Sequence, residues 1–202
     1  MELFDYIRSS AAFRVRIALN LKKLDWETVP VDLLQAEQRG EAYRALNPQG
    51  LVPALRLDSG EIITQSLAIL EWLEECHPEP ALLPADALAR ARVRSLMYAV
   101  ACDIHPLNNL RVLKYLIGEL GHSEEEKLAW YHHWLGLGFA ALEQQVQGPR
   151  YCHGDALSLA DVCLVPQMFN ARRFELDLAP YPRLVAISQH LESLDAFVRA
   201  AP

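Results

Sequence analysis

Hydrophobic and polar positions follow two different periods in the first part of the chain. Apolar residues at alternate positions predict strands over 1–6 and 26–32, and apolar residues at helical spacing predict a helix over 11–22. A short helix over 41–46 comes next, followed by strands over 52–57 and 61–63 that a turn at 58–60 joins into a hairpin. A helix over 66–76, with Ser66 as its predicted cap, completes the order β-α-β-α-β-β-α.

The pattern changes at residues 77–86, where Pro78, Pro80 and Pro84 stop one helix and prevent another from starting. We therefore predict two domains, 1–80 and 87–202. The second domain shows only helical periods, over 87–101, 109–120, 124–147 and 182–200. Ser158 and Asp161 have the spacing of a capping box before the apolar run 162–165, which predicts a further, buried helix.

Composition narrows the class of protein. Of the 202 residues, 51% are hydrophobic and 22% are charged, which is typical of globular proteins. No apolar stretch approaches the roughly 18 residues of a membrane span, and no signal peptide pattern opens the chain, so a soluble cytoplasmic protein without a membrane partner is expected. The 19 basic and 26 acidic residues give a formal charge of -7, which disfavours nucleic acid as a partner.

The four cysteines do not indicate redox or metal chemistry. Cys76, Cys102, Cys152 and Cys163 form no Cys-x-x-Cys pair and have no zinc-ligand spacing with the seven histidines. We predict no metal site and no disulfide framework, and we interpret the cysteines as buried reduced thiols.

The first loop of the chain suggests a borrowed thiol. The element order, with a proline at the start of the third strand, fits a thioredoxin-like layout in which a helix N-terminus follows strand one. A redox member would place Cys-x-x-Cys there, because the helix dipole and unpaired N–H groups stabilise a thiolate. This chain has Arg-Ser-Ser-Ala-Ala at 8–12. The sulfur would then come from a ligand, and glutathione is the obvious candidate.

Several motifs resemble one family. Arg-Ser-Ser at 8–10 followed by Arg-Val-Arg-Ile-Ala-Leu at 14–19 resembles the signature of zeta-class glutathione transferases. Segments 45–48, 51–55 and 65–69 match the family's glutathione site in order and spacing, and segments 103–109 and 161–167 are similar to its second domain. The resemblance implies a thioredoxin-like α/β domain followed by an all-α domain, as in cytosolic glutathione transferases, and a homodimer.

The resemblance also implies roles for individual residues. Ser9 or Ser10 would hydrogen-bond the glutathione sulfur, and the backbone of Val52, before a cis Pro53, would pair with its cysteinyl unit. Taken alone, a serine at this place is a plain helix cap and an X-Pro bond is usually trans. The resemblance also implies that Gln65 and Ser66 hold the γ-glutamyl end of glutathione and that Gln38 contacts its glycyl end. His105 and Asn109 match the positions that complete the glutathione site.

The resemblance further implies a glutathione-dependent cis-trans isomerase. Its substrate would be the dicarboxylate maleylacetoacetate, from tyrosine and phenylalanine breakdown, and Arg8 and Arg173 are the foremost candidates to bind the carboxylates, ahead of Arg111 and Arg172. The alternatives are maleylpyruvate as substrate, a transferase or dehalogenase of small electrophiles, and a binding protein with a vestigial site. Ala11 stands where eukaryotic isomerases of this family usually have cysteine.

Overall fold

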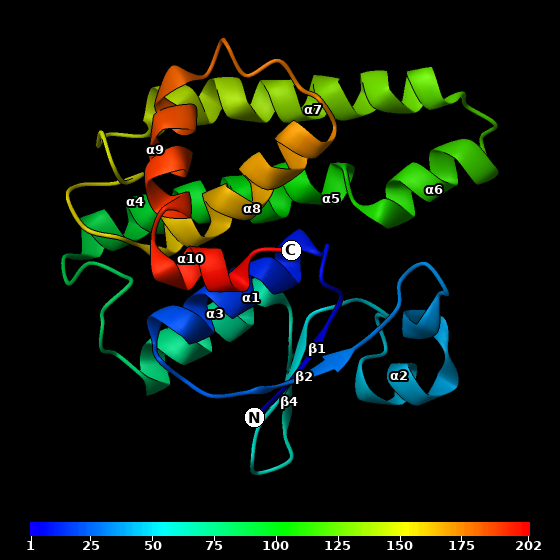
Figure 1. Cartoon of the computed structure of the whole chain (residues 1–202), viewed down its shortest axis with the longest axis horizontal. Coiled ribbons are helices and arrows are strands. Elements are labelled where there is room, and N and C mark those ends of the chain that lie inside the picture. The colour runs from blue at the N-terminus through cyan, green and yellow to red at the C-terminus, as the bar shows by residue number, and fades with distance from the viewer. The chain divides into compact units, whose positions relative to one another are not determined.

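The computed structural model describes all 202 residues, which form two compact units (Figure 1). The first comprises residues 1–82 and 194–202, and the second comprises residues 83–193. The predicted fold class, a thioredoxin-like domain and a helical domain, is confirmed. The last nine residues, which the sequence pattern assigned to the second domain, pack with the first.

A four-stranded sheet forms the centre of the first unit. Its strand order is β2-β1-β3-β4, with β1 parallel to β2 and antiparallel to β3, and β3 antiparallel to β4. Leu3 of β1 and Leu55 of β3 are fully buried, so the two central strands contribute the apolar core of the sheet. The strands are β1 (Glu2–Asp5), β2 (Glu27–Pro30), β3 (Ala54–Arg56) and β4 (Ile62–Thr64), and the helices between them are α1 (Ser10–Leu21), α2 (Glu41–Leu46) and α3 (Ser66–Cys76).

Helix α1 is buried on almost every side. Its apolar residues Phe13, Val15, Ile17 and Leu19 are at most 3% exposed, and α1 packs against both α3 and the C-terminal helix α10 (Asp195–Ala200). Phe197 of α10 is buried, which explains why the end of the chain belongs to this unit. The helix predicted over 182–200 is therefore two helices, α9 (Pro182–Glu192) and α10.

The second unit contains only helices. A π-helical turn, Ala99–Ile104, follows α4. The N–H of His105 donates to the carbonyl of Val100, five residues back, and Pro106, the next residue, has no N–H group for a regular helical bond. No helix of the structure is both long and apolar enough to cross a lipid bilayer. The helices are α4 (Ala87–Tyr98), α5 (His105–Leu107), α6 (Leu110–Gly118), α7 (Glu124–Gln145), α8 (Leu159–Arg173) and α9.

A buried carboxylate fixes the start of α8. Asp161 is fully buried and accepts hydrogen bonds from Ser158 N at 2.8 Å, Ser158 Oγ at 2.9 Å and Cys152 N at 2.7 Å. The predicted capping box is therefore present, and it also ties the loop before α8 to the helix. Burial raises the pKa of Asp161, and the hydrogen bonds from Cys152 and Ser158 partly offset that rise.

Candidate functional site

The sheet topology brings the predicted glutathione residues of the first unit to one end of the sheet. Phe4 pairs with Ala54, and Ala54 pairs with Thr64, in antiparallel register. The loop after β1, the segment before β3 and the start of α3 therefore lie at the same sheet end. Because β2 runs parallel to β1, the loop after β2 also leaves from this end. These four segments carry Arg8, Ser9, Ser10, Gln38, Val52, Gln65 and Ser66.

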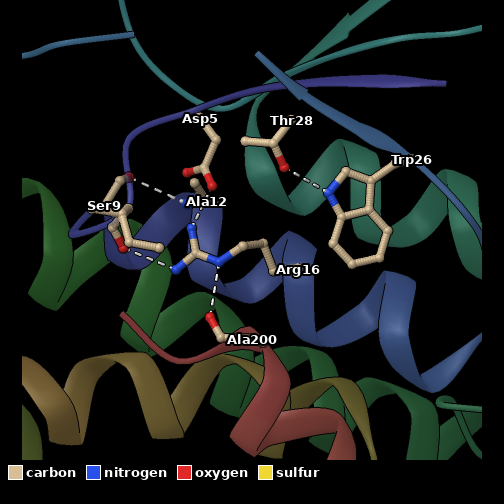
Figure 2. A network of polar contacts seen from close by, with 8 residues as sticks. Asp5, Ser9, Ala12, Arg16, Trp26, Thr28 and Ala200 are labelled. Carbon is tan, nitrogen blue, oxygen red and sulfur yellow. Dashed lines mark hydrogen bonds and ion pairs between the residues drawn. The ribbon is translucent and has the colours of Figure 1, made fainter. Parts of the chain in front are cut away.

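Ser9 is the N-cap of α1, which is the role expected of a serine at this place when it is taken alone. Its Oγ accepts a hydrogen bond from Ala12 N at 3.2 Å (Figure 2). Its own N–H donates to Tyr6 O at 2.7 Å. The hydroxyl of Ser9 accepts in the cap, so its proton remains able to donate to a ligand atom. Ser9 is partly exposed, whereas Ser10, the first residue of α1, is only 4% exposed; Arg8 lies exposed in the same loop.

The peptide bond between Val52 and Pro53 is cis, as the resemblance implies. The backbone N–H and C=O of Val52 form no hydrogen bond within the chain, although Val52 directly precedes the paired part of β3. The neighbouring carbonyl of Leu51 accepts two hydrogen bonds of 2.7 Å, from the Tyr43 hydroxyl and the Asn47 side-chain amide. Burial raises the pKa of Tyr43 to about 12, so this hydroxyl stays a donor at neutral pH. The backbone N–H and C=O of Val52 are thus available to pair with the backbone of a peptide-like ligand, as in an added strand.

Gln38 and Gln65 both contact the loop that precedes Val52. A Cβ on Gly50, whose φ is +62°, would lie 2.8 Å from the carbonyl oxygen of Gln38, so the two backbones approach closely. The side chain of Gln65 donates to Gln49 Oε1 at 2.6 Å. Gln38 is 9% exposed and its Oε1 has no hydrogen-bond partner, although its position in a polar loop favours a solvated side chain. A buried, unpartnered amide oxygen at this place suits a ligand donor.

The prediction that Ser66 caps α3 is wrong. Gln65, with φ +71°, occupies the cap position, and Ser66 is the first helical residue. The Ser66 hydroxyl instead accepts a hydrogen bond of 3.2 Å from Arg14 Nη1 of α1, and both side chains are buried. This bond links the start of α3 to α1, and it places a guanidinium beside the predicted γ-glutamyl position.

In the second unit, His105 and Asn109 lie close together around the break between α5 and α6. The side-chain nitrogen of Asn109 is 3.3 Å from His105 Nε2, while Asn109 Oδ1 accepts from Arg111 N at 3.1 Å and caps α6. Both residues are partly exposed, and the side chain of Arg111 is exposed.

The two adjacent arginines at the end of α8 differ in their engagement. Arg172 donates to Glu192 at 2.5 Å and to Ser188 Oγ at 3.2 Å, so its guanidinium is already paired. Arg173 is exposed and lies over the ring of Phe174, which stacks on Tyr131 at 4.0 Å. Of this pair, Arg173 is therefore the better candidate for a ligand carboxylate.

A cavity of about 500 Å³ lies between the π-helical turn, α5 and α7 in the second unit. Its lining is mostly apolar, and its one charged group is the carboxylate of Asp103. Because no basic side chain lines it, this cavity does not suit an anionic substrate. It is lined by Cys102, Asp103, Ile104, Pro106, Leu107 and Trp134, with Leu137 and Gly138.

The cysteines only partly match their prediction. Cys152 and Cys163 are buried as expected, but Cys76 at the end of α3 and Cys102 in the π-helical turn are exposed. None of the four lies at the start of α1, and no group of three or more metal-ligating side chains is close enough to hold an ion. The candidate site offers hydroxyls and backbone groups but no thiol.

Two residues of this region were missed as site residues in the sequence. Arg14 and Arg16 belong to the signature at 14–19, but their charge predicts exposure, whereas they are 1% and 5% exposed. The available signal was their spacing, since both fall within a helix whose neighbouring positions are all apolar.

Comparison with known proteins identifies the family. The model of the glutathione S-transferase N-terminal domain matches residues 8–76, and that of the glutathione S-transferase C-terminal domain matches residues 135–195. The chain belongs to the glutathione S-transferase family. One relative is described as zeta-class: a solved maleyl pyruvate isomerase, a bacterial zeta-class glutathione S-transferase, is 49% identical with a TM-score of 0.97, over 100% of this chain and 97% of that one.

Two further relatives are named as isomerases. The maleylacetoacetate isomerase of Pseudomonas aeruginosa is 48% identical over 100% of this chain and 96% of its own length. A solved maleylacetoacetate isomerase from Methylobacterium extorquens AM1, with bound malonate and glutathione, is 42% identical with a TM-score of 0.96, over the full length of both chains.

Proposed function

We propose that this protein is a glutathione-dependent cis-trans isomerase that converts maleylacetoacetate to fumarylacetoacetate. The observation that carries the proposal is the full-length similarity, at 48% identity, to a maleylacetoacetate isomerase, in a chain whose first helix begins with serines in place of a cysteine.

The residues at the sheet end fit glutathione. The open backbone of Val52 would pair with the cysteinyl unit, and the unpartnered Oε1 of Gln38 would accept from the N–H of the glycyl unit. Gln65 and Ser66 would hold the γ-glutamyl end, with the N–H groups of α3 facing its carboxylate. We also propose His105 and Asn109 as glutathione contacts. When bound, glutathione supplies the thiol whose reversible addition to the cis double bond permits rotation about the resulting single bond.

Ser9 would hold the sulfur as a thiolate. Its hydroxyl oxygen accepts from Ala12 N, so its proton donates to the sulfur, and the N-terminus of α1 favours the negative charge. Ser10 is too deeply buried to be the principal donor. We therefore assign the main role to Ser9, with Ser10 as its buried neighbour.

The substrate carboxylates would be bound by Arg8 and Arg173, which are exposed and make no ion pair. Arg111 is a further exposed cation beside Asn109, whereas Arg172 is already paired with Glu192. Positive charge near the reacting carbons also stabilises the electron density that develops there during addition.

Maleylpyruvate is the second candidate substrate. The 49% identity to a maleyl pyruvate isomerase over nearly the same length favours it. Both substrates are cis-unsaturated keto diacids, so the same site chemistry would serve either one. We further propose a cytoplasmic homodimer, as is typical of this family.

The test follows the loss of the cis substrate's absorbance with purified protein, with and without glutathione. We expect glutathione-dependent turnover of both substrates, with a higher kcat/KM for maleylacetoacetate. A higher kcat/KM for maleylpyruvate would make maleylpyruvate the preferred substrate. The absence of glutathione-dependent turnover of either substrate would refute the proposal. A stable glutathione adduct as the main product would indicate a conjugating transferase instead.

A further inference from the structure

A buried guanidinium lies beneath the loop that presents Ser9. Arg16 of α1 is 5% exposed and donates three hydrogen bonds, to Asp5 Oδ2 at 2.6 Å, to Ile7 O at 2.9 Å and to Ala200 O at 2.9 Å. Figure 2 shows the side chain reaching Asp5 on one side and Ala200 on the other. One residue thus joins the end of β1, the loop at 6–9 and the C-terminal helix α10.

The loop at 6–9 has few other constraints. Ile7 is 52% exposed and Arg8 is exposed, so neither side chain is held by packing in the core. Three hydrogen bonds hold the backbone of this loop: from Ser9 N to Tyr6 O, at 2.7 Å, from Phe13 N to Ser9 O, at 2.8 Å, and from Arg16 to Ile7 O. The bond from Arg16 is the one that holds the middle of the loop. A short exposed loop with so few ties depends on each of them for its conformation.

Asp5 explains why an arginine is tolerated in this buried place. Its carboxylate is 3% exposed and pairs with Arg16, so neither charge is buried without a partner. The Nε and Nη2 groups of the planar guanidinium then each donate to a backbone carbonyl. The ammonium group of a lysine is a point charge on a flexible stem and does not provide this fixed set of donors.

We propose that Arg16 is a positioning residue for the isomerase reaction. By holding the carbonyl of Ile7, it fixes the loop so that the hydroxyl of Ser9 and the start of α1 face the glutathione sulfur, and it anchors this arrangement to α10. The proposal rests on the proposed function, since it concerns the same thiol site. Arg16 does not touch the substrate; it acts through Ser9.

The chain offers a matched control on the same helix. Lys22, at the end of α1, is also a buried cation: it donates to Glu74 Oε2 at 2.6 Å and to Pro80 O at 2.8 Å. Replacing Lys22 therefore disrupts a buried ion pair of α1 without touching the loop at 6–9. A comparison of Arg16→Lys with Lys22→Met separates the positioning role from general loss of stability.

The experiment measures the pKa of glutathione's thiol in the binary complex, from thiolate absorbance, together with kcat and KM. For Arg16→Lys we expect the thiol pKa to rise by about one unit or more, because a displaced Ser9 no longer donates to the thiolate, and kcat to fall about 10- to 100-fold. Glutathione affinity should change less than about threefold, since Val52, Gln65 and Ser66 remain. Lys22→Met should leave the thiol pKa and kcat near wild type at temperatures where it is folded.

Amide hydrogen exchange without any ligand gives a readout that does not depend on activity. We expect exchange at Ser9, whose N–H donates to Tyr6 O, to speed up in Arg16→Lys but not in Lys22→Met. This arm stands even if the wild-type protein isomerises nothing, in which case the proposed function fails separately. If Arg16→Lys does not fold, Asp5→Asn replaces it, with smaller changes expected in the same direction. Wild-type exchange and thiol pKa in a folded variant, or equal changes in Lys22→Met, would overturn the proposal.

Discussion

Ser9 uses the two parts of its hydroxyl group differently. The oxygen accepts from Ala12 N and caps α1, while the proton is free to donate toward a bound sulfur. A substitution that removes the hydroxyl thus affects both stability and chemistry. The two effects are separable because glycine, unlike alanine, is an adequate N-cap residue.

We predict that Ser9→Gly lowers kcat/KM about 100-fold, because a donor to the developing charge is lost. The free energy of unfolding should change by only a few tenths of a kcal/mol, against about 1 kcal/mol for Ser9→Ala. Steady-state kinetics and denaturant unfolding measure both quantities. Ser10→Ala should lose less activity than Ser9→Gly, and the reverse order would assign the thiol contact to Ser10.

The four cysteines should differ in their reactivity toward thiol reagents. Burial, reinforced by the nearby Asp161 carboxylate, raises the pKa of the Cys152 thiol well above its ordinary value, and Cys163 is also buried. Since the thiolate is the reactive form, a thiol reagent at neutral pH should modify Cys76 and Cys102 rapidly in the native protein. The other two thiols should react only after denaturation, and rapid native labelling of Cys152, located by mass spectrometry, would contradict this.

At the scale of elements, α7 and the π-helical turn pack closely at a glycine. A Cβ on Gly138 would lie 2.3 Å from both Cγ1 and Cδ1 of Ile104, which is itself 3% exposed. Ile104 directly precedes His105, so this contact also helps to fix the position of His105 at the start of α5. The close approach requires the glycine.

We predict that Gly138→Ala destabilises the protein by about 1–3 kcal/mol, because the extra methyl group overpacks a buried contact. Gly118, at the end of α6, is the matched control, since a Cβ there meets no atom within 4 Å. Gly118→Ala should be neutral or stabilise the protein by up to about 1 kcal/mol through helix propensity. Denaturant unfolding of both variants checks the contrast, and equal effects would contradict the packing argument.

At the scale of the whole molecule, the helical unit leaves an exposed stripe along α4. Leu88 is 61% exposed and Tyr98 is 42% exposed, and the positions between them at helical spacing, Arg92 and Ser95, are exposed as well. Two large apolar side chains on one open helix face are consistent with the proposed homodimer.

We predict a mass in light scattering of twice the 22.8 kDa of one chain. Tyr98→Glu should shift the protein toward the monomer, because a charge buried in an interface is costly, whereas a charge on an open surface is nearly neutral. Tyr115→Glu on α6, where the tyrosine is 56% exposed, is the control and should leave the mass unchanged. A wild-type monomer would contradict the homodimer.

Most elements of the fold follow from local pattern. The bounds of α2 and α3 match their predictions, and β1 to β4 fall within or beside the predicted strands, because periodicity and turn residues act over a few positions. Helix ends were harder: the π-helical turn after α4 and the break before α10 depend on Pro106 and on where Phe197 packs. Local propensity does not encode such distant packing.

The pattern and motifs of the chain are enough to give the element order of the first unit, the missing cysteine at the first helix and the residues proposed to bind glutathione. Three other features emerge only from the folded chain: α10 belongs with the first unit, Ser66 accepts from Arg14 instead of capping α3, and Arg16 binds the loop that precedes Ser9. The physical reason is that these decisions rest on contacts between residues as far apart as Arg16 and Ala200. A buried charge is recognisable only when its partners are in place.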